Sequence, residues 1–305
     1  ARPQHGHPRA SAEPTCRASS AGLELMSLTH PDPSFAHRVE MASAEPELLV
    51  AVDRPRRRAT LTINRAKSLG SLSRVVFESL VGALEELGAD SGISCIILAS
   101  AGKAFSSGNA VLGNELPPDA LAREAIAAME RCPVPIVVAV QGFAYTGALE
   151  VLAAADFVVA AATAYFQDTH AVLGLVPTWG GNSNLPHKIG LLRAKDLAFT
   201  CRRVSAQEAL AWGLVSRVVP EAQLLDEAHA IADAIAVLSR DSVAKQKLMM
   251  TQASKRALGE ALERNVREHP GHADDMVDRL KALRSRGKKG AASEKAEGSP
   301  QRSKL

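Results

Sequence analysis

Apolar and polar positions alternate with two different periods along the middle of the chain. Residues 48–55 and 59–66 are short runs with β-forming side chains, which predicts two strands that pair as a hairpin. Residues 73–88 carry apolar side chains at helical spacing, so we expect a helix there. Ser73 is its predicted N-cap and Gly88 its predicted C-terminal stop.

Strand and helix signals continue to alternate up to residue 204. Three apolar runs predict buried strands, at 93–100, 135–142 and 156–166. Between the first two, residues 118–132 have the periodicity of a helix. Strands that alternate with helices imply an α/β core with parallel strands.

From Ser205 onward the pattern is almost wholly helical. The ends of the chain have no hydrophobic periodicity and are rich in small, charged and proline residues, which is typical of disordered segments. We therefore expect a disordered N-terminal extension (1–45), an α/β core (46–204), a helical C-terminal region (205–286) and a flexible tail (287–305).

Both ends offer targeting signals. Translation starting at Met41 is one interpretation of the first segment; an Arg-rich transit segment is the other, since residues 1–22 hold a single acid, Glu13. The sequence ends in Ser303-Lys304-Leu305, a peroxisomal address read by an import receptor. The alternative is an ordinary solvated tail.

Composition excludes several classes of protein. The 305 residues are 46% hydrophobic, which suits one globular domain with extensions. Lys and Arg total 36 against 33 acids, and most of the surplus lies in the tails, so we expect no nucleic-acid partner. No apolar run reaches the roughly 20 residues that a membrane span needs.

Cysteine and histidine give no sign of a metal site. Of the four cysteines, Cys95, Cys132 and Cys201 lie in apolar runs, as expected of reduced core thiols in a reducing compartment. Cys16 lies in the N-terminal extension. The histidines are scattered rather than set at ligand spacing.

Candidate chemistry lies in two loops that follow buried strands, at 101–113 and 142–150. In parallel sheets, ligands bind beyond the carboxyl ends of the strands, where such loops meet. Gly147 begins a predicted helix, and the first N–H groups of a helix have no partner within it. Each loop can thus supply one backbone N–H to a single carbonyl oxygen, forming an oxyanion hole.

Glu150 stands in the first turn of that helix and has two interpretations. It complements the helix dipole or closes a capping box around Gly147. Alternatively, it is an acid/base that faces a bound carbonyl compound. Spacing alone does not separate the two.

The motifs resemble the crotonase superfamily, also called the enoyl-CoA hydratase/isomerase family, over residues 47 to about 270. The matching segments are 60–73, 103–111, 133–166, 174–190 and 205–220. The match is ordered along the chain, and no G-x-G-x-x-G turn supports a Rossmann fold. The resemblance implies an α/β spiral of β-β-α units followed by a helical C-terminal region.

The resemblance also implies an acyl-CoA substrate whose thioester oxygen is held by two main-chain amides. At the matching positions these belong to Asn109 and Gly147. Thr146 and Ala148 replace glycines that many members have, but both are small. The implied substrate-binding residues are Lys67, Phe105, Ser106, Ser107 and Gly108. Lys67 is equally interpreted as a solvated surface lysine.

Glu150 matches one of the two catalytic glutamates of the hydratases. The second falls where this sequence has His170, and the isomerase position falls on Thr178, so neither carries a glutamate. His170 is a candidate general acid or base, and Asp168 either orients its ring or only terminates the strand. The alternative is that His170 only satisfies local backbone groups and Glu150 works alone.

Three functions follow. The leading hypothesis is a 2-enoyl-CoA hydratase of fatty-acid β-oxidation. The second is a Δ3,Δ2-enoyl-CoA isomerase or another crotonase chemistry, although Ala110 and Thr178 replace the acids expected there. The third is a weakly catalytic acyl-CoA-binding protein.

Family members form trimers, often paired as hexamers. The apolar stripes of residues 230–239 and 257–265 suit subunit packing, or they cover the chain's own core. No cofactor is implied, because CoA is part of the substrate. The expected location is a peroxisome or a glycosome-like organelle, with the mitochondrion as the alternative.

Overall fold

The computed structural model describes residues 45–110, 115–256, 260, 274–279 and 281–282. Its strands are β1 (Leu48–Asp53), β2 (Arg58–Ile63), β3 (Cys95–Ser100), β4 (Ile136–Val140), β5 (Phe143–Tyr145), β6 (Phe157–Ala161), β7 (Tyr165–Gln167), β8 (Val204–Ser205) and β9 (Arg217–Val219). Its α-helices are α1 (Arg74–Ala89), α2 (Asp119–Arg131), α3 (Gly147–Ala154), α4 (Gly181–Ile189), α5 (Leu191–Thr200), α6 (Ala206–Trp212), α7 (Leu224–Ala236) and α8 (Arg240–Ala253). Single 3-10 turns are η1 (Ala66–Ser68), η3 (Ala171–Leu173) and η4 (Glu221–Gln223).

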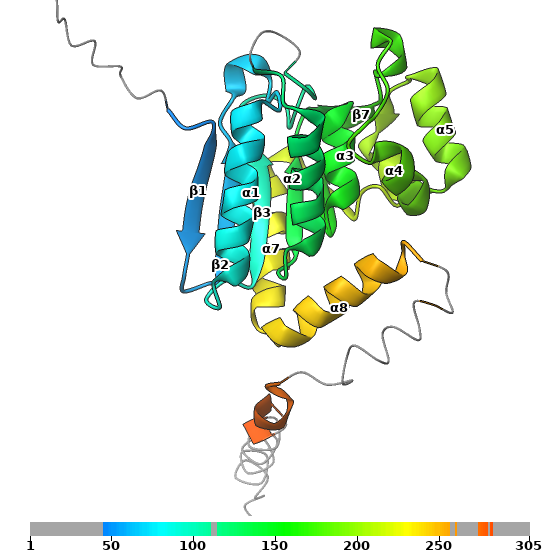
Figure 1. The fold of residues 1–305 in the computed structure, drawn as a ribbon. Coiled ribbons are helices and arrows are strands. Elements are labelled where there is room, and N and C mark those ends of the chain that lie inside the picture. Colours follow the sequence, from blue (N-terminus) through cyan, green and yellow to red (C-terminus); the bar gives the residue numbers. More distant parts are fainter. Residues whose placement is uncertain (1–44, 111–114, 257–259, 261–273, 280, 283–305) are drawn as a thin grey trace, which may run out of the picture. The chain divides into compact units, whose positions relative to one another are not determined.

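The main sheet has six strands in the order β1-β2-β3-β4-β6-β9. β1 and β2 form the predicted antiparallel hairpin, and each later neighbour pairs in parallel. α1 and α2 lie in front of this sheet and α7 lies behind it (Figure 1). The sequence therefore predicted the α/β core correctly.

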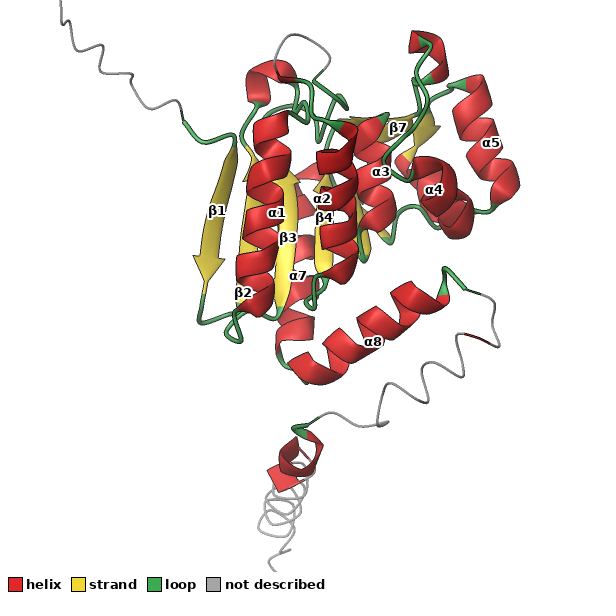
Figure 2. Ribbon diagram, viewed as in Figure 1, coloured by secondary structure: helices red, strands yellow, loops and turns green. Residues whose placement is uncertain are grey.

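A second, smaller layer turns the fold into a spiral of β-β-α units. Its three strands are ordered β5-β7-β8, and single bridges (Leu72 with Asn109, Ser106 with Ala144) extend the same pairing to earlier segments. After each of β2, β3 and β4 the chain makes a short β contact in this layer and then enters a helix (Figure 2). The residues just before α3 and those around Asn109 thus occupy equivalent places in successive units.

Helix α1 begins as predicted and ends later than predicted. The Ser73 hydroxyl accepts a hydrogen bond from the N–H of Val76, which makes it the N-cap. The helix passes through Gly88 and ends at Ala89, with Asp90 as its C-cap. A Cβ at Gly88 would lie 3.0 Å from Pro133 Cδ, so the proline ring packs closely against this position.

The run 156–166 is not one strand but two. β6 belongs to the main sheet, and after a turn at residues 162–163 the chain continues as β7 in the smaller sheet. The run contains no glycine or proline to mark that turn, so its apolar pattern is continuous across both strands.

The segment after Ser205 is less purely helical than its pattern predicted. β9 pairs with β6 and completes the main sheet, but three residues are too few to show a period. The stripe within 230–239 covers the chain's own sheet, since Ile231 and Ala232 are buried there. The stripe at 257–265 lies largely outside the described residues, as do both expected terminal tails.

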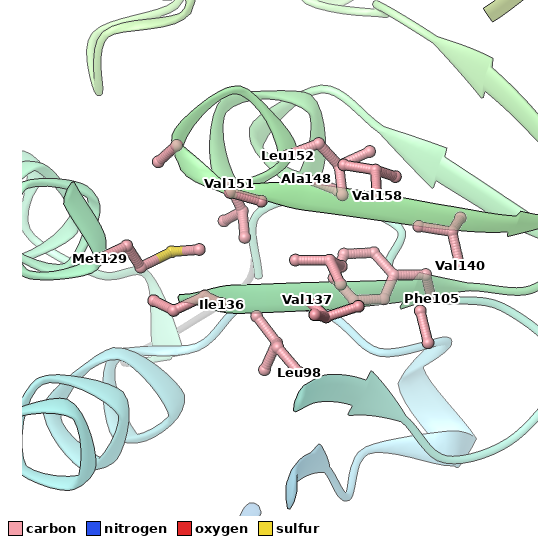
Figure 3. Close-up of a cluster of buried hydrophobic side chains, with 14 of the residues drawn as sticks. Leu98, Phe105, Met129, Ile136, Val137, Val140, Ala148, Val151, Leu152 and Val158 are labelled. Carbon is pink, nitrogen blue, oxygen red and sulfur yellow. The ribbon is translucent and has the colours of Figure 1, made fainter. Parts of the chain in front are cut away.

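Helix α3 lies at the centre of the core, with all eight residues buried. Figure 3 shows Ala148 and Leu152 of α3 in the cluster that also holds Val137 of β4. A polar side chain on α3 must therefore find its partners inside the protein, because solvent does not reach it.

The structure bears on three features considered in the sequence: the cysteines, membrane spans and metal sites. Cys95, Cys132 and Cys201 are free thiols, and burial raises the pKa of Cys95 to about 12. Among the described helices, none has both the length and the apolar character that crossing a membrane requires. The described part of the chain also contains no cluster of three or more His, Cys, Asp or Glu residues suited to a metal ion.

Candidate active site

The two predicted loops lie side by side. The N–H of Ser106 donates to the Phe143 carbonyl at 3.2 Å, and the N–H of Tyr145 donates to the Ser106 carbonyl at 3.0 Å. These bonds join the loop after β3 to β5, the short strand just before α3 that lies within the second predicted loop. The topology therefore brings together segments that are about 40 residues apart in sequence, as expected beyond the ends of parallel strands.

Gly108 allows the two loops to approach this closely. Its φ is +89°, and a Cβ at this position would lie 2.5 Å from Thr146 Oγ1 and 2.9 Å from the Tyr145 carbonyl oxygen. Both the backbone conformation and the space require glycine. Asn109 follows directly after this close approach in the sequence.

Asn109 and Gly147 both present free main-chain donors. The bridge to Leu72 uses the carbonyl of Gly108 and the N–H of Ala110, so the N–H of Asn109 faces the other way. Gly147 is the first residue of α3, where an N–H has no partner within the helix. No hydrogen bond of either N–H occurs among the residues that the structure describes.

Thr146 immediately precedes the Gly147 donor and has a strained backbone. Its φ is +47° and its ψ is −112°, a conformation rare for a β-branched residue. Its hydroxyl does not cap α3. Strain of this kind is concentrated at functional sites, where the surrounding structure enforces it.

Glu150 is buried, at 2% exposure, and its carboxylate is held from one side. Oε1 accepts hydrogen bonds from the N–H of Trp179 at 3.0 Å and from the N–H of Gly181 at 2.8 Å. Gly181 is the first residue of α4, so Glu150 caps that helix and not its own. The expected capping box around Gly147 is therefore not formed, and Oε2 faces another group.

That group is His170, which extends a chain of three titratable side chains. Its Nδ1 lies 2.6 Å from Asp168 Oδ1, and its Nε2 lies 3.8 Å from Glu150 Oε2. The His170 N–H also donates to Asp168 Oδ1, at 3.0 Å. Asp168 therefore fixes both the backbone and the ring of His170, which directs Nε2 toward the carboxylate.

Burial raises the pKa of Glu150 above its ordinary value. The two backbone N–H donors and the nearby His170 oppose that rise, but loss of hydration is the larger effect. A carboxylate with a raised pKa is a stronger base and exchanges a proton closer to neutral pH.

Thr178, the other place where a family glutamate was expected, points elsewhere. Its side chain is exposed, and its hydroxyl donates to Asp119 Oδ1 at 3.0 Å, at the start of α2. The structure thus brings Glu150, His170 and Asp168 together and leaves Thr178 outside the group.

The residues expected to bind substrate fall into two sets. Phe105 and Ser106 are fully buried, with Phe105 in the core and the Ser106 hydroxyl accepting from the Gly108 N–H, so their side chains serve the fold. Ser107 is partly exposed and donates to the Ser68 carbonyl, next to exposed Lys67 in η1. Lys67 and Ser107 therefore border the same loop pair.

Trp179 is the site residue that the sequence did not single out. Its N–H holds Glu150, its indole packs against Gly147, and its Nε1 donates to Asp119 Oδ1 at 3.2 Å. The available signal was the Gly180-Gly181 pair ahead of a helix, which marks a helix N-terminus with free donors.

A β-β-α spiral with a buried acid–base group and two main-chain donors beyond the ends of its parallel strands is an arrangement suited to a substrate with a carbonyl oxygen. A family model described as enoyl-CoA hydratase/isomerase matches residues 56–285. The chain belongs to this family and is an enzyme of it.

Individual relatives agree with that assignment. A probable peroxisomal enoyl-CoA hydratase 1 of Arabidopsis thaliana is 34% identical over 211 residues, which cover 67% of this chain and 78% of the relative. A probable mitochondrial enoyl-CoA hydratase of Dictyostelium discoideum is 32% identical over 207 residues, covering 66% and 75%. The crystal structure of an enoyl-CoA hydratase from Bacillus anthracis has a TM-score of 0.73 at 30% identity, over 79% of this chain and 96% of that chain.

Proposed function

We propose that this enzyme adds water to the double bond of a 2-enoyl-CoA thioester, as a step of fatty-acid β-oxidation. The observation that carries the proposal is the 3.8 Å approach of Glu150 Oε2 and His170 Nε2, one turn along α3 from the free N–H of Gly147. The names of the relatives support the same substrate class.

The thioester oxygen binds to the N–H groups of Asn109 and Gly147. Attack of water on the β-carbon moves electron density onto that oxygen, so donors aimed at it stabilise the enolate as it forms. Gly147 also contributes the positive end of the α3 dipole. The bordering residues Lys67 and Ser107 are proposed to contact the CoA moiety.

The attacking water lies between Glu150 and His170. Because Asp168 accepts the Nδ1 proton of His170, Nε2 is left as an acceptor. A water that donates one hydrogen to Nε2 and the other to Glu150 Oε2 has an oxygen lone pair free for the β-carbon. His170 thus takes the place of the second family glutamate.

Protons and electrons balance through Glu150. As the water oxygen bonds to the β-carbon, its proton passes to Oε2 and the double-bond electrons move to the thioester oxygen. The enolate then takes the proton at the α-carbon, which restores the carboxylate. One water is consumed, and both new bonds form on the same side of the substrate.

Loss of crotonyl-CoA absorbance tests this reaction directly. The wild-type protein is expected to hydrate it, and Glu150→Gln to lose roughly 10²–10⁴-fold in kcat/KM, the usual contribution of a positioned acid/base. A matched control is Glu85→Gln, an exposed glutamate on α1. Hydration by Glu150→Gln at the wild-type rate would refute the assignment.

Isomerisation is the second candidate, because a single carboxylate is enough to move one proton from the α- to the γ-carbon. Glu150 is the only glutamate in the described group of three. Conversion of a 3-enoyl-CoA to the conjugated product without water addition would favour it. Tight acyl-CoA binding with no turnover of either substrate would indicate a binding protein instead.

Peroxisomal import through Ser303-Lys304-Leu305 is part of the proposal, with a homotrimer or hexamer as the assembly. The tripeptide lies outside the described residues, and a fluorescent fusion with and without it tests import; mitochondrial fluorescence would favour the other organelle. Exposed Leu192 and Phe199 on α5 offer an apolar surface for a second copy. Light scattering of the purified protein gives the number of subunits.

A further inference from the structure

The indole of Trp179 occupies the space directly beside Gly147. A Cβ built on Gly147 would overlap the edge of the ring, 2.9 Å from Cη2 and 3.2 Å from Cε3. The side chain is 4% exposed, so the ring is inside the protein and not at its surface. It therefore forms a wall next to the main-chain donor that begins α3.

Three contacts fix this wall in place. Nε1 donates to Asp119 Oδ1 at 3.2 Å, and the ring meets Phe77 of α1 edge to face, with centroids 5.2 Å apart and planes at 87°. The Trp179 N–H donates to Glu150 Oε1. Displacing the indole would break the bond to Asp119 and the packing on Phe77, and would disturb the loop that positions the catalytic carboxylate.

We propose that Trp179 limits the length of the acyl chain, so that the enzyme acts on short-chain thioesters. The inference rests on the proposed function, because it takes the thioester oxygen to be at Gly147 and the double bond to be beside Glu150. The Trp179 ring packs against Gly147, and the Trp179 main-chain N–H holds Glu150 Oε1, so the indole lies beside the position of the thioester group in the proposed complex. Methylene groups beyond the β-carbon compete with the indole for space.

Asp119 is a positioning residue that holds the Trp179 indole in place. Its Oδ1 accepts from both the Trp179 ring and the Thr178 hydroxyl, which ties the 178–181 loop to the start of α2. Thr178, which stands where the family resemblance led us to expect a glutamate, thus helps to hold this loop. Removing the Asp119 carboxylate should make the indole more mobile, while the ring still fills the same space.

The test compares hydration of four-, eight- and twelve-carbon 2-enoyl-CoA by wild type, Trp179→Ala, Trp179→Phe and Asp119→Ala. Wild type is expected to prefer the four-carbon substrate. Trp179→Ala should raise the twelve- to four-carbon ratio of kcat/KM by roughly tenfold or more, since a single methylene changes selectivity about 10-fold or more in a fitted apolar pocket. Asp119→Ala should raise the ratio less, and Trp179→Phe least.

An equal loss on all three substrates in Trp179→Ala would overturn the inference and leave a purely structural role. So would a wild-type preference for the twelve-carbon substrate. Binding of butyryl-CoA and dodecanoyl-CoA, measured by calorimetry, separates this failure from failure of the proposed reaction. If binding shows the ratio change but no variant hydrates, the wall is correct and the reaction is wrong; if neither thioester binds wild type, both are wrong.

Discussion

Glu150 connects activity to the stability of the fold. Burial raises its pKa above the ordinary 4.5, so the folded state holds the proton at pH values where the unfolded chain has released it. Its contribution to stability is therefore favourable at low pH and decreases as pH rises through that window, until the folded carboxyl ionises. Glu150→Gln removes this dependence, and its unfolding free energy should exceed that of wild type increasingly above pH ~4.5.

Urea unfolding of the two proteins between pH 4 and pH 8 measures the difference. Glu85→Gln on the surface of α1 should show no such divergence, because its side chain is exposed. A variant that is less stable than wild type at every pH would contradict this expectation. It would mean that hydrogen bonds from Trp179 and Gly181 to a charged carboxylate stabilise the fold by more than burial of the charge destabilises it.

Asp168 is expected to act through His170 and not on substrate. Asp168→Asn offers an N–H to Nδ1 and so favours the tautomer that carries its proton on Nε2, which can no longer accept from water. Hydration should fall by roughly tenfold or more, and His170→Ala should fall further. Nitrogen NMR of the imidazole should show the proton on Nδ1 in wild type and on Nε2 in Asp168→Asn. An unchanged tautomer with lower activity would mean a structural role only.

At the level of the helix, the strained backbone at the start of α3 reduces the stability of the fold, and a substitution can relieve that strain. The φ of +47° at Thr146 costs on the order of 1–3 kcal/mol for a side chain with a Cβ. Thr146→Gly relieves this at the expense of about 0.5–1 kcal/mol of chain entropy, so we expect a net gain of about 1 kcal/mol in urea unfolding. Thr146→Ala keeps the Cβ and should gain little. Destabilisation by glycine would show that the threonine side chain contributes packing that outweighs the strain.

The hydrophobic pattern of the sequence predicted several helices and strands correctly and missed others. Helical spacing predicted α1 and α2, with Ser73 as the N-cap of α1, and short β-forming runs predicted the hairpin. They did not separate β6 from β7, because the turn at residues 162–163 contains neither glycine nor proline. β9 was missed for a different reason: its three residues are held by β6 rather than by their own pattern.

Site residues were predictable where a loop follows a strand, and not where distant segments meet. Gly147 and Glu150 are local to one helix start, so the sequence placed them next to each other. The contacts of Glu150 with Trp179 and of Trp179 with Asp119 join residues 29 and 60 positions apart, which no local pattern encodes. The ring of Phe105 lies in the core although its neighbours at the loop are polar.

At the scale of the whole molecule, Lys247 attaches helix α8 to the core. Its side chain is 5% exposed, its Nζ lies 2.7 Å from Asp156 Oδ2, and it donates to the carbonyls of Met129 and Val134. Met129 lies in the last turn of α2, Val134 lies just before β4, and Asp156 lies just after α3. One ammonium group therefore satisfies three separate elements beneath α8.

Replacing that ammonium should weaken the attachment of α8 far more than replacing an exposed neighbour. Lys247→Met leaves Asp156 and two carbonyls without their cation, which we expect to cost about 3 kcal/mol in urea unfolding. Lys255→Met, which removes a half-exposed lysine from Glu130, should cost below about 1 kcal/mol. Protease cleavage within α8 should speed up for Lys247→Met alone, because the helix separates before the sheet unfolds. If the two variants lose equal stability, burial of Lys247 is not what holds α8 against the core.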